Sequence, residues 1–159
     1  HMAMELLLST LGTRLTHVPY KGPGPAAQDV MAGHVDCSFV VSSVVLPHVQ
    51  SGRLRAIAVS SKERSVVLTD VPTVAESGHP GFDATFFETL MAPAALPAAV
   101  VDKIQRDVRA ALVAPAMKAR LAEMDLRVEA STPAQARQRS QEDFAKWGAV
   151  AQKTGLQLD

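Results

Sequence analysis

The stretch His17–Phe39, HVPYKGPGPAAQDVMAGHVDCSF, decides the fold that we predict for this chain. Residues 16–20 are expected to be extended, because a proline at position 19 disfavours helical geometry in the residue before it. The next four residues, Lys21 to Gly24, form a loop that contains two glycines, which are free to adopt positive φ angles. By itself this loop is consistent either with a tight connecting turn or with an anion-binding loop.

A short helix is predicted over residues 26–32. Pro25 suits its first turn, where a missing N–H has no cost, and Gly33 is the residue expected just past its end. The apolar residues 35–41 then predict a second strand. A strand, loop, helix and strand in this order present backbone N–H groups at a helix N-terminus, and this arrangement favours an anionic ligand.

The composition excludes several classes of protein. Among 159 residues, 16 are Lys or Arg and 16 are Asp or Glu, so the formal net charge is zero. A general nucleic-acid binder needs a basic face, and a base-stacking surface needs more aromatic residues than the 4% present here. No apolar run approaches the roughly 18 residues of a membrane span.

The rest of the chain alternates between the two types of secondary structure and then becomes mainly helical. Such alternation predicts an α/β lobe in which helices flank a parallel or mixed sheet, followed by C-terminal helices. The further expected helices are 4–11, 44–51, 71–78, one that follows Pro97 and runs to about residue 113, 116–124 and 134–153. The further expected strands are 53–60, 81–92 and 126–129.

No arrangement of residues indicates catalysis or metal binding. Ser42, Asp70 and His79 would make a triad only on paper, since no G-x-S-x-G elbow is present. The histidines lack the spacing of zinc ligands, so we predict neither a metal nor a cofactor. Cys37, the only cysteine, lies in a predicted apolar strand and is expected to be a buried, unreactive thiol.

Two serines, Ser42 and Ser43, precede the predicted helix 44–51. A serine at this position usually caps the backbone N–H groups of the helix, and this is the favoured interpretation. The alternative is that the two hydroxyl groups contact a ligand.

Several motifs occur in the order typical of one family. They are HVPYKGPGPA at 17–26, LPH at 46–48 followed by SGRLRAIAV at 51–59, DVPTVAESG at 70–78 followed by PGF at 80–82, and MAPA at 91–94. Together they resemble the solute receptors of tripartite tricarboxylate transporters, also called Bug-type receptors. The resemblance covers nearly the whole chain.

The resemblance implies a type II periplasmic-binding-protein fold, in which two lobes close on a small organic anion, commonly a carboxylate. Residues 4–90 would be the second, ligand-binding lobe, and 91–159 the hinge strand and the helical segment that completes the first lobe. The N-terminal lobe is expected to be missing, so the chain would be a truncated or isolated domain. No signal peptide is present, and the periplasmic location follows from the resemblance alone.

The same resemblance supplies the candidate site and partners. The expected ligand contacts are Tyr20, Lys21, Gly22, Pro23, Gly24, Ser42 and Ser43. The expected partners are a carboxylate, the membrane subunits of a transporter, and a second copy of the chain bound through the C-terminal helices. Without its first lobe, the apolar stripe that contains Val100, Val101, Ile104 and Val108 would be exposed.

The chain departs from the family pattern at a few positions. Val40 and Val41 stand where the family often has an Asp-Asn pair, which weakens the case for an amino-acid ligand, because an ammonium group would lack its partner. Phe87 aligns with a usual tryptophan, and Thr89 with a glycine. The alternatives are an effector-binding domain of a transcription regulator, a small α/β enzyme, and a fragment that binds no ligand by itself.

Overall fold

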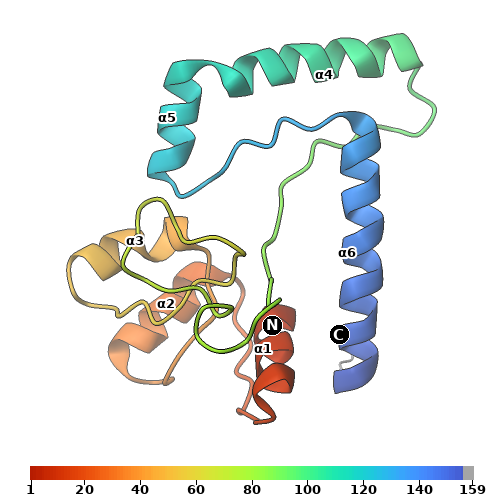
Figure 1. The fold of residues 1–159 in the computed structure, drawn as a ribbon. Coiled ribbons are helices and arrows are strands. Elements are labelled where there is room, and N and C mark those ends of the chain that lie inside the picture. Colours follow the sequence, from red (N-terminus) through yellow and green to blue (C-terminus); the bar gives the residue numbers. More distant parts are fainter. Residues whose placement is uncertain (156–159) are drawn as a thin grey trace. The chain divides into compact units, whose positions relative to one another are not determined.

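The protein is represented by a computed structural model that describes residues 1–155 (Figure 1). The chain divides into two compact units. Unit 1 comprises His1–Thr85 together with the described residues from Ala149 onward, and unit 2 comprises Phe86–Gly148. The helices are α1 (Met2–Leu11), α2 (Pro23–Ala32), α3 (Ser42–Gln50), α4 (Ala98–Val113), α5 (Pro115–Glu123) and α6 (Pro133–Thr154).

Helix α2 begins earlier than predicted. Its first residue is Pro23 rather than Ala26, because proline fixes the helical φ angle and lacks only an N–H that would have no partner in the first turn. The preceding residue, Gly22, has φ 143° and ψ 174°, a conformation essentially restricted to glycine. Gly33 ends the helix in the left-handed region, at φ 76°, as predicted.

The predicted parallel or mixed sheet is not confirmed. Within residues 1–155 no strand is assigned, and the segments 16–20, 35–41, 53–60, 81–92 and 126–129 lack regular strand pairing. A strand exists only where a neighbouring segment accepts and donates its ladder hydrogen bonds. Extended geometry and apolar composition, which the sequence encodes locally, are not sufficient to provide that neighbour.

One small remnant of sheet pairing does form, around Val59. The Val59 N–H donates to the Pro72 carbonyl at 2.9 Å, and the Val59 carbonyl accepts from the Val74 N–H at 3.0 Å. These two bonds make a parallel bridge between Val59 and Thr73. On the adjacent residue, the Ser60 carbonyl accepts from the Ala84 N–H at 2.9 Å. Three segments of unit 1 are therefore joined at this point.

Residues 71–78 form turns rather than the predicted helix. Their conformation is fixed by a reciprocal pair of hydrogen bonds. The Thr73 N–H donates to Glu76 Oε2 at 2.8 Å, and the Glu76 N–H donates to Thr73 Oγ1 at 3.0 Å. This is the capping-box arrangement, which normally starts a helix. Here the chain reaches Gly78, at φ 102°, before a helix develops.

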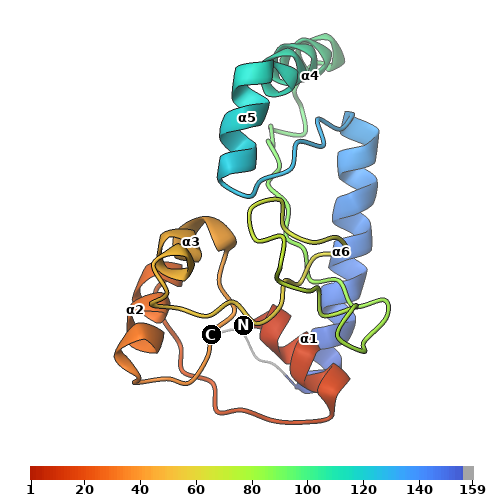
Figure 2. The same ribbon diagram turned by 60° about the vertical axis from the view of Figure 1, so that its left-hand side comes forward.

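The buried residues of the described chain all belong to unit 1. Thr73 is 1% exposed, and the apolar members are Leu8, Ala26, Ala27, Val45, Val74, Phe82, Ala84 and Val150. Helices α2 and α3 contact each other, and they lie side by side in both views (Figures 1 and 2). The site residues discussed below precede or begin these two helices.

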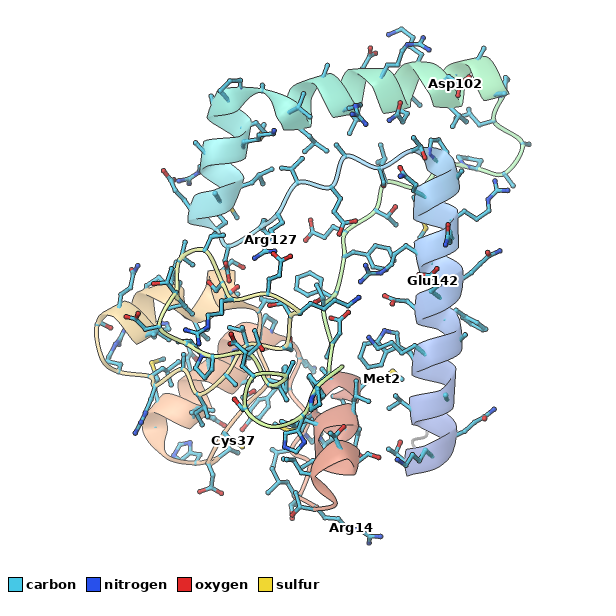
Figure 3. All side chains as sticks on the ribbon, viewed as in Figure 1. Met2, Arg14, Cys37, Asp102, Arg127 and Glu142 are labelled. Carbon is cyan, nitrogen blue, oxygen red and sulfur yellow. The ribbon has the colours of Figure 1, made fainter. Side chains whose placement is uncertain are left out.

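Cys37 is exposed, contrary to the prediction. It lies in the segment between α2 and α3 and is labelled in Figure 3. Its burial was predicted because it lies in an expected apolar strand. In residues 1–155 that strand is not assigned, so no sheet covers the thiol.

Unit 2 consists of helices and connecting segments and has no buried core. Helices α4 and α5 contact each other and meet at a corner at Ala114 (Figure 2). The start of α6 is capped, since the Thr132 N–H donates to Gln135 Oε1 at 2.9 Å and Thr132 Oγ1 accepts from the Gln135 N–H at 3.3 Å. No residue of 86–148 is buried, and Ile104 and Phe144 are 37% and 84% exposed.

Candidate functional site

The loop before α2 contains five of the seven predicted site residues, Tyr20 to Gly24. In the structure the last two of them, Pro23 and Gly24, already belong to the first turn of α2. Lys21 is exposed and forms no ion pair within the described chain. Its ammonium group is therefore available to a negatively charged ligand from solvent.

The first turn of α2 offers two backbone donors. The first four N–H groups of a helix have no partner within it, and here two of the four positions are prolines, which have no N–H. The remaining donors are the N–H groups of Gly22 and Gly24. Neither donates to an acceptor in the part of the chain that the structure describes. Both lie at the positive end of the helix dipole, where an anion is stabilised.

Ser42 and Ser43 lie in the first turn of α3, so the favoured capping interpretation is wrong. The N-cap of α3 is Val41, and no side chain caps the helix. The helix starts two residues earlier than predicted, which places both serines inside it rather than before it. Their hydroxyl groups form no hydrogen bond with residues 1–155. A role in ligand contact therefore stays a prediction.

Asp29, which the sequence did not single out, is the centre of the one side-chain cluster next to the loop. The Tyr20 hydroxyl donates to Asp29 Oδ2 at 2.7 Å, and His34 Nδ1 lies 3.2 Å from Asp29 Oδ1. The hydrogen bond with Tyr20, followed by that with His34, lowers the pKa of Asp29 below its ordinary value. The same bond to a carboxylate raises the pKa of Tyr20.

The structure thus brings some of the predicted residues together and not others. Tyr20 to Gly24 are continuous with α2, and α2 contacts α3, which begins with the two serines. Among residues 1–155 no hydrogen bond or ion pair joins the loop to either serine. The Tyr20 hydroxyl is already engaged by Asp29, so this group is not a free donor.

A small pocket of about 160 Å³ lies elsewhere in unit 1, between α1 and the end of α6. It includes none of the predicted site residues. Two of its lining hydroxyl groups, on Thr10 and Thr154, donate to carbonyls of their own helices at 2.8 and 2.9 Å. These two hydroxyl groups are therefore engaged within their own helices, and neither is a free donor for a ligand in the pocket.

Within residues 1–155, no group of three or more His, Cys, Asp or Glu side chains is arranged to hold a metal ion. No helix of the described chain is both long and apolar enough to cross a membrane.

Comparison with known proteins identifies the family. Residues 1–156 match the family described as tripartite tricarboxylate transporter family receptor. The chain belongs to this receptor family. The resemblance found in the sequence motifs is thereby confirmed. Because the family consists of receptors, the prediction that the chain is not an enzyme is confirmed as well.

Among curated relatives of this receptor family, Protein BugT of Bordetella pertussis (strain Tohama I) is 33% identical over 158 residues. The match includes 99% of this chain and 48% of BugT. The chain therefore spans about half the length of this curated relative.

Two solved structures are similar to almost the whole chain. The structure of R. palustris Rpa4515 with adipate has a TM-score of 0.88 and 28% identity, and the match covers 98% of this chain and 52% of that one. The periplasmic binding protein BugD has a TM-score of 0.85 and 29% identity, with 99% and 53% covered. These likenesses confirm the periplasmic-binding-protein type of fold, although the predicted sheet is not confirmed in residues 1–155.

Proposed function

We propose that this chain carries part of the binding site of a solute receptor for a small organic carboxylate. The observation that carries the proposal is membership of the receptor family, together with similarity to a structure solved with adipate. The chain spans about half the length of BugT, so the activity of a full-length receptor is also a proposal here and not a finding.

The geometry of the loop suggests how a carboxylate would bind. The N–H groups of Gly22 and Gly24 donate to its oxygens, at the positive end of α2. Lys21, which is exposed, adds a positive charge close to these donors. The hydroxyl groups of Ser42 and Ser43 serve as further donors at the start of α3. Recognition then depends mainly on backbone and hydroxyl donors rather than on a buried ion pair.

Calorimetric titration of the chain with adipate tests this function. We expect heat of binding with adipate and none with adipamide, in which neutral amides replace both carboxylates. The double variant Ser42→Ala/Ser43→Ala should bind adipate at least about 10-fold more weakly, since one lost hydrogen bond to a charged group is worth about 1.5–3 kcal/mol. Ser140→Ala is the matched control, because the Ser140 hydroxyl donates to the Ala136 carbonyl within α6. Absence of binding to adipate, citrate and aromatic acids by the folded chain would contradict the proposal.

We also propose the biological setting from the family. The receptor would act in the periplasm, deliver its solute to the membrane subunits of a tripartite tricarboxylate transporter, and use residues 4–90 as its ligand-binding lobe. Residues 91–159 would then return to the other lobe. Support for this setting is the family membership and the likeness to a periplasmic binding protein.

A second copy of the chain is a further proposed partner, through the C-terminal helices. Its support is the exposed apolar surface of unit 2, to which Val100 at 41%, Ile104 at 37% and Phe144 at 84% contribute. Light scattering over a range of concentrations is expected to detect a dimer. A monomer at every concentration, up to the millimolar range, would rule this partner out.

A further inference from the structure

The Asp29 carboxylate lies between the two ends of α2. One of its oxygens accepts the Tyr20 hydroxyl hydrogen bond, at 2.7 Å, from the segment before the helix. The other oxygen lies 3.2 Å from Nδ1 of the His34 imidazole, just past the helix. The backbone N–H of His34 also donates to the backbone carbonyl of Asp29 at 2.9 Å. A single residue of α2 thus contacts both flanking segments.

The Tyr20 contact folds the chain back along α2. Asp29 is six residues beyond Pro23, which corresponds to about 9 Å along the helix axis. The Tyr20 hydroxyl nevertheless reaches the Asp29 carboxylate, so the residue before the loop is held near the body of the helix. Between these two points lies Gly22, whose φ of 143° provides the reversal.

These contacts bear on the two donors of the proposed carboxylate site. The N–H groups of Gly22 and Gly24 point in directions that are set by the conformation of residues 20–24. A loop that is already ordered in the free protein loses little conformational entropy when the ligand binds. The smaller entropy cost makes binding tighter. A hydrogen bond from the Tyr20 hydroxyl to a carboxylate is of the stronger, charge-assisted type.

We propose that Asp29 and Tyr20 are positioning residues, which fix the loop 20–24 so that the Gly22 and Gly24 N–H groups are aimed at the carboxylate of the ligand. Asp29 acts through Tyr20 and does not contact the ligand itself. The inference rests on the proposed function, and it goes beyond it by giving a role to a residue outside the predicted contact set.

The test uses Tyr20→Phe, which removes one hydroxyl group and keeps the ring, and Asp29→Asn. Both are expected to bind adipate about 3- to 10-fold more weakly than the unaltered chain, in keeping with the loss of one solvent-accessible hydrogen bond to a charged group. His34→Gln is the matched control, since it alters the contact at the other end of α2, and it should bind adipate within about twofold of the unaltered chain.

Two readouts separate positioning from a general loss of structure. In nuclear magnetic resonance spectra, the amide signals of Gly22 and Gly24 should shift in Tyr20→Phe while those of α4, in unit 2, stay in place. Tyr20 is the only tyrosine, so its ionisation can be followed by ultraviolet absorbance. Asp29→Asn should lower the pKa of Tyr20, because the carboxylate that opposes ionisation is gone.

The outcomes distinguish this inference from the proposed function. If the unaltered chain binds adipate and Tyr20→Phe binds it equally well, the inference is overturned and the function stands. If the unaltered chain binds none of the acids, the function is overturned, and the Gly22 and Gly24 signals decide the positioning claim alone. Unchanged signals in Tyr20→Phe would then overturn it.

Discussion

Replacing Thr73 with valine should destabilise unit 1, and the structure gives the size of the effect. Thr73 is 1% exposed, and its Oγ1 accepts the Glu76 N–H at 3.0 Å. Valine has nearly the same shape but no acceptor, so the substitution leaves packing almost unchanged and removes this hydrogen bond. The hydrogen bond is part-buried, because the acceptor lies on a buried residue and the donor on an exposed one, so its loss should cost about 1–2 kcal/mol.

The start of α6 provides a matched control. Thr132→Val makes the same chemical change in the same kind of capping arrangement, where Thr132 Oγ1 accepts the Gln135 N–H at 3.3 Å. This site is exposed, so water can replace the lost acceptor. We expect a loss of about 0.5–1 kcal/mol, at the lower end for a helix cap. The difference between the variants therefore isolates the effect of burial.

Urea unfolding measures both variants with a separate probe for each unit. Tyr20, the only tyrosine, belongs to unit 1, and Trp147, the only tryptophan, belongs to unit 2. Thr73→Val should lower the midpoint followed by Tyr20 absorbance, by more than Thr132→Val lowers the midpoint followed by Trp147 fluorescence. Equal losses in the two variants would refute the reasoning from burial, as would a Thr73→Val variant of unchanged stability.

Three other predictions concern individual residues. Gly22→Ala should cost about 1–3 kcal/mol of stability, because alanine is strained at φ 143°. Gly148→Ala, within α6 and with open space around it, should instead add about 0.5–1 kcal/mol. Thermal unfolding compares the two variants, and a stabilised Gly22→Ala variant would contradict the backbone conformation at Gly22. The hydrogen bond from the Thr73 N–H, followed by that from the Arg64 guanidinium, lowers the pKa of Glu76. The stability that this carboxylate contributes is therefore present above its ordinary pKa of 4.5 and is lost as the pH falls through the lower folded value. Glu76→Gln should flatten this acid dependence in urea unfolding at several pH values, and an unchanged pH profile would contradict the prediction. Cys37, being exposed, should react with a thiol reagent in the native chain as completely as in urea, and protection in the native state would show that it is covered.

Six of the predicted helices formed because their signals are local, whereas the one predicted at 71–78 did not. Gly33 marked the end of α2, and α6 begins one residue before the predicted start. The strands could not be predicted with the same success, since a ladder requires hydrogen bonds to a segment far away in the chain. Within residues 1–155, the parallel bridge at Val59 is the one piece of strand pairing that formed. The strand expected around Cys37 is not assigned, and the thiol is exposed.

The candidate site shows the same division. The stretch Lys21–Gly24 was predicted correctly to lie at a helix N-terminus, because glycine and proline restrict the backbone wherever they occur, but its last two residues belong to the helix and not to the loop. The role of Ser42 was misassigned because α3 starts two residues earlier, at a boundary that serine and valine do not define sharply. Asp29 was missed, since its nine-residue separation from Tyr20 matches no helical or strand repeat.

The alternation of glycine and proline at the start of α2 also has a consequence for the choice between anions. A helix whose first turn keeps all its N–H groups can serve the three terminal oxygens of a phosphate monoester. Here Pro23 and Pro25 remove two donors and leave Gly22 and Gly24. Two donors match the two oxygens of a carboxylate and leave one phosphate oxygen without a backbone partner. If this helix end is the binding site proposed above, we expect the prolines at alternate positions to disfavour phosphorylated metabolites without any clash or repelling charge.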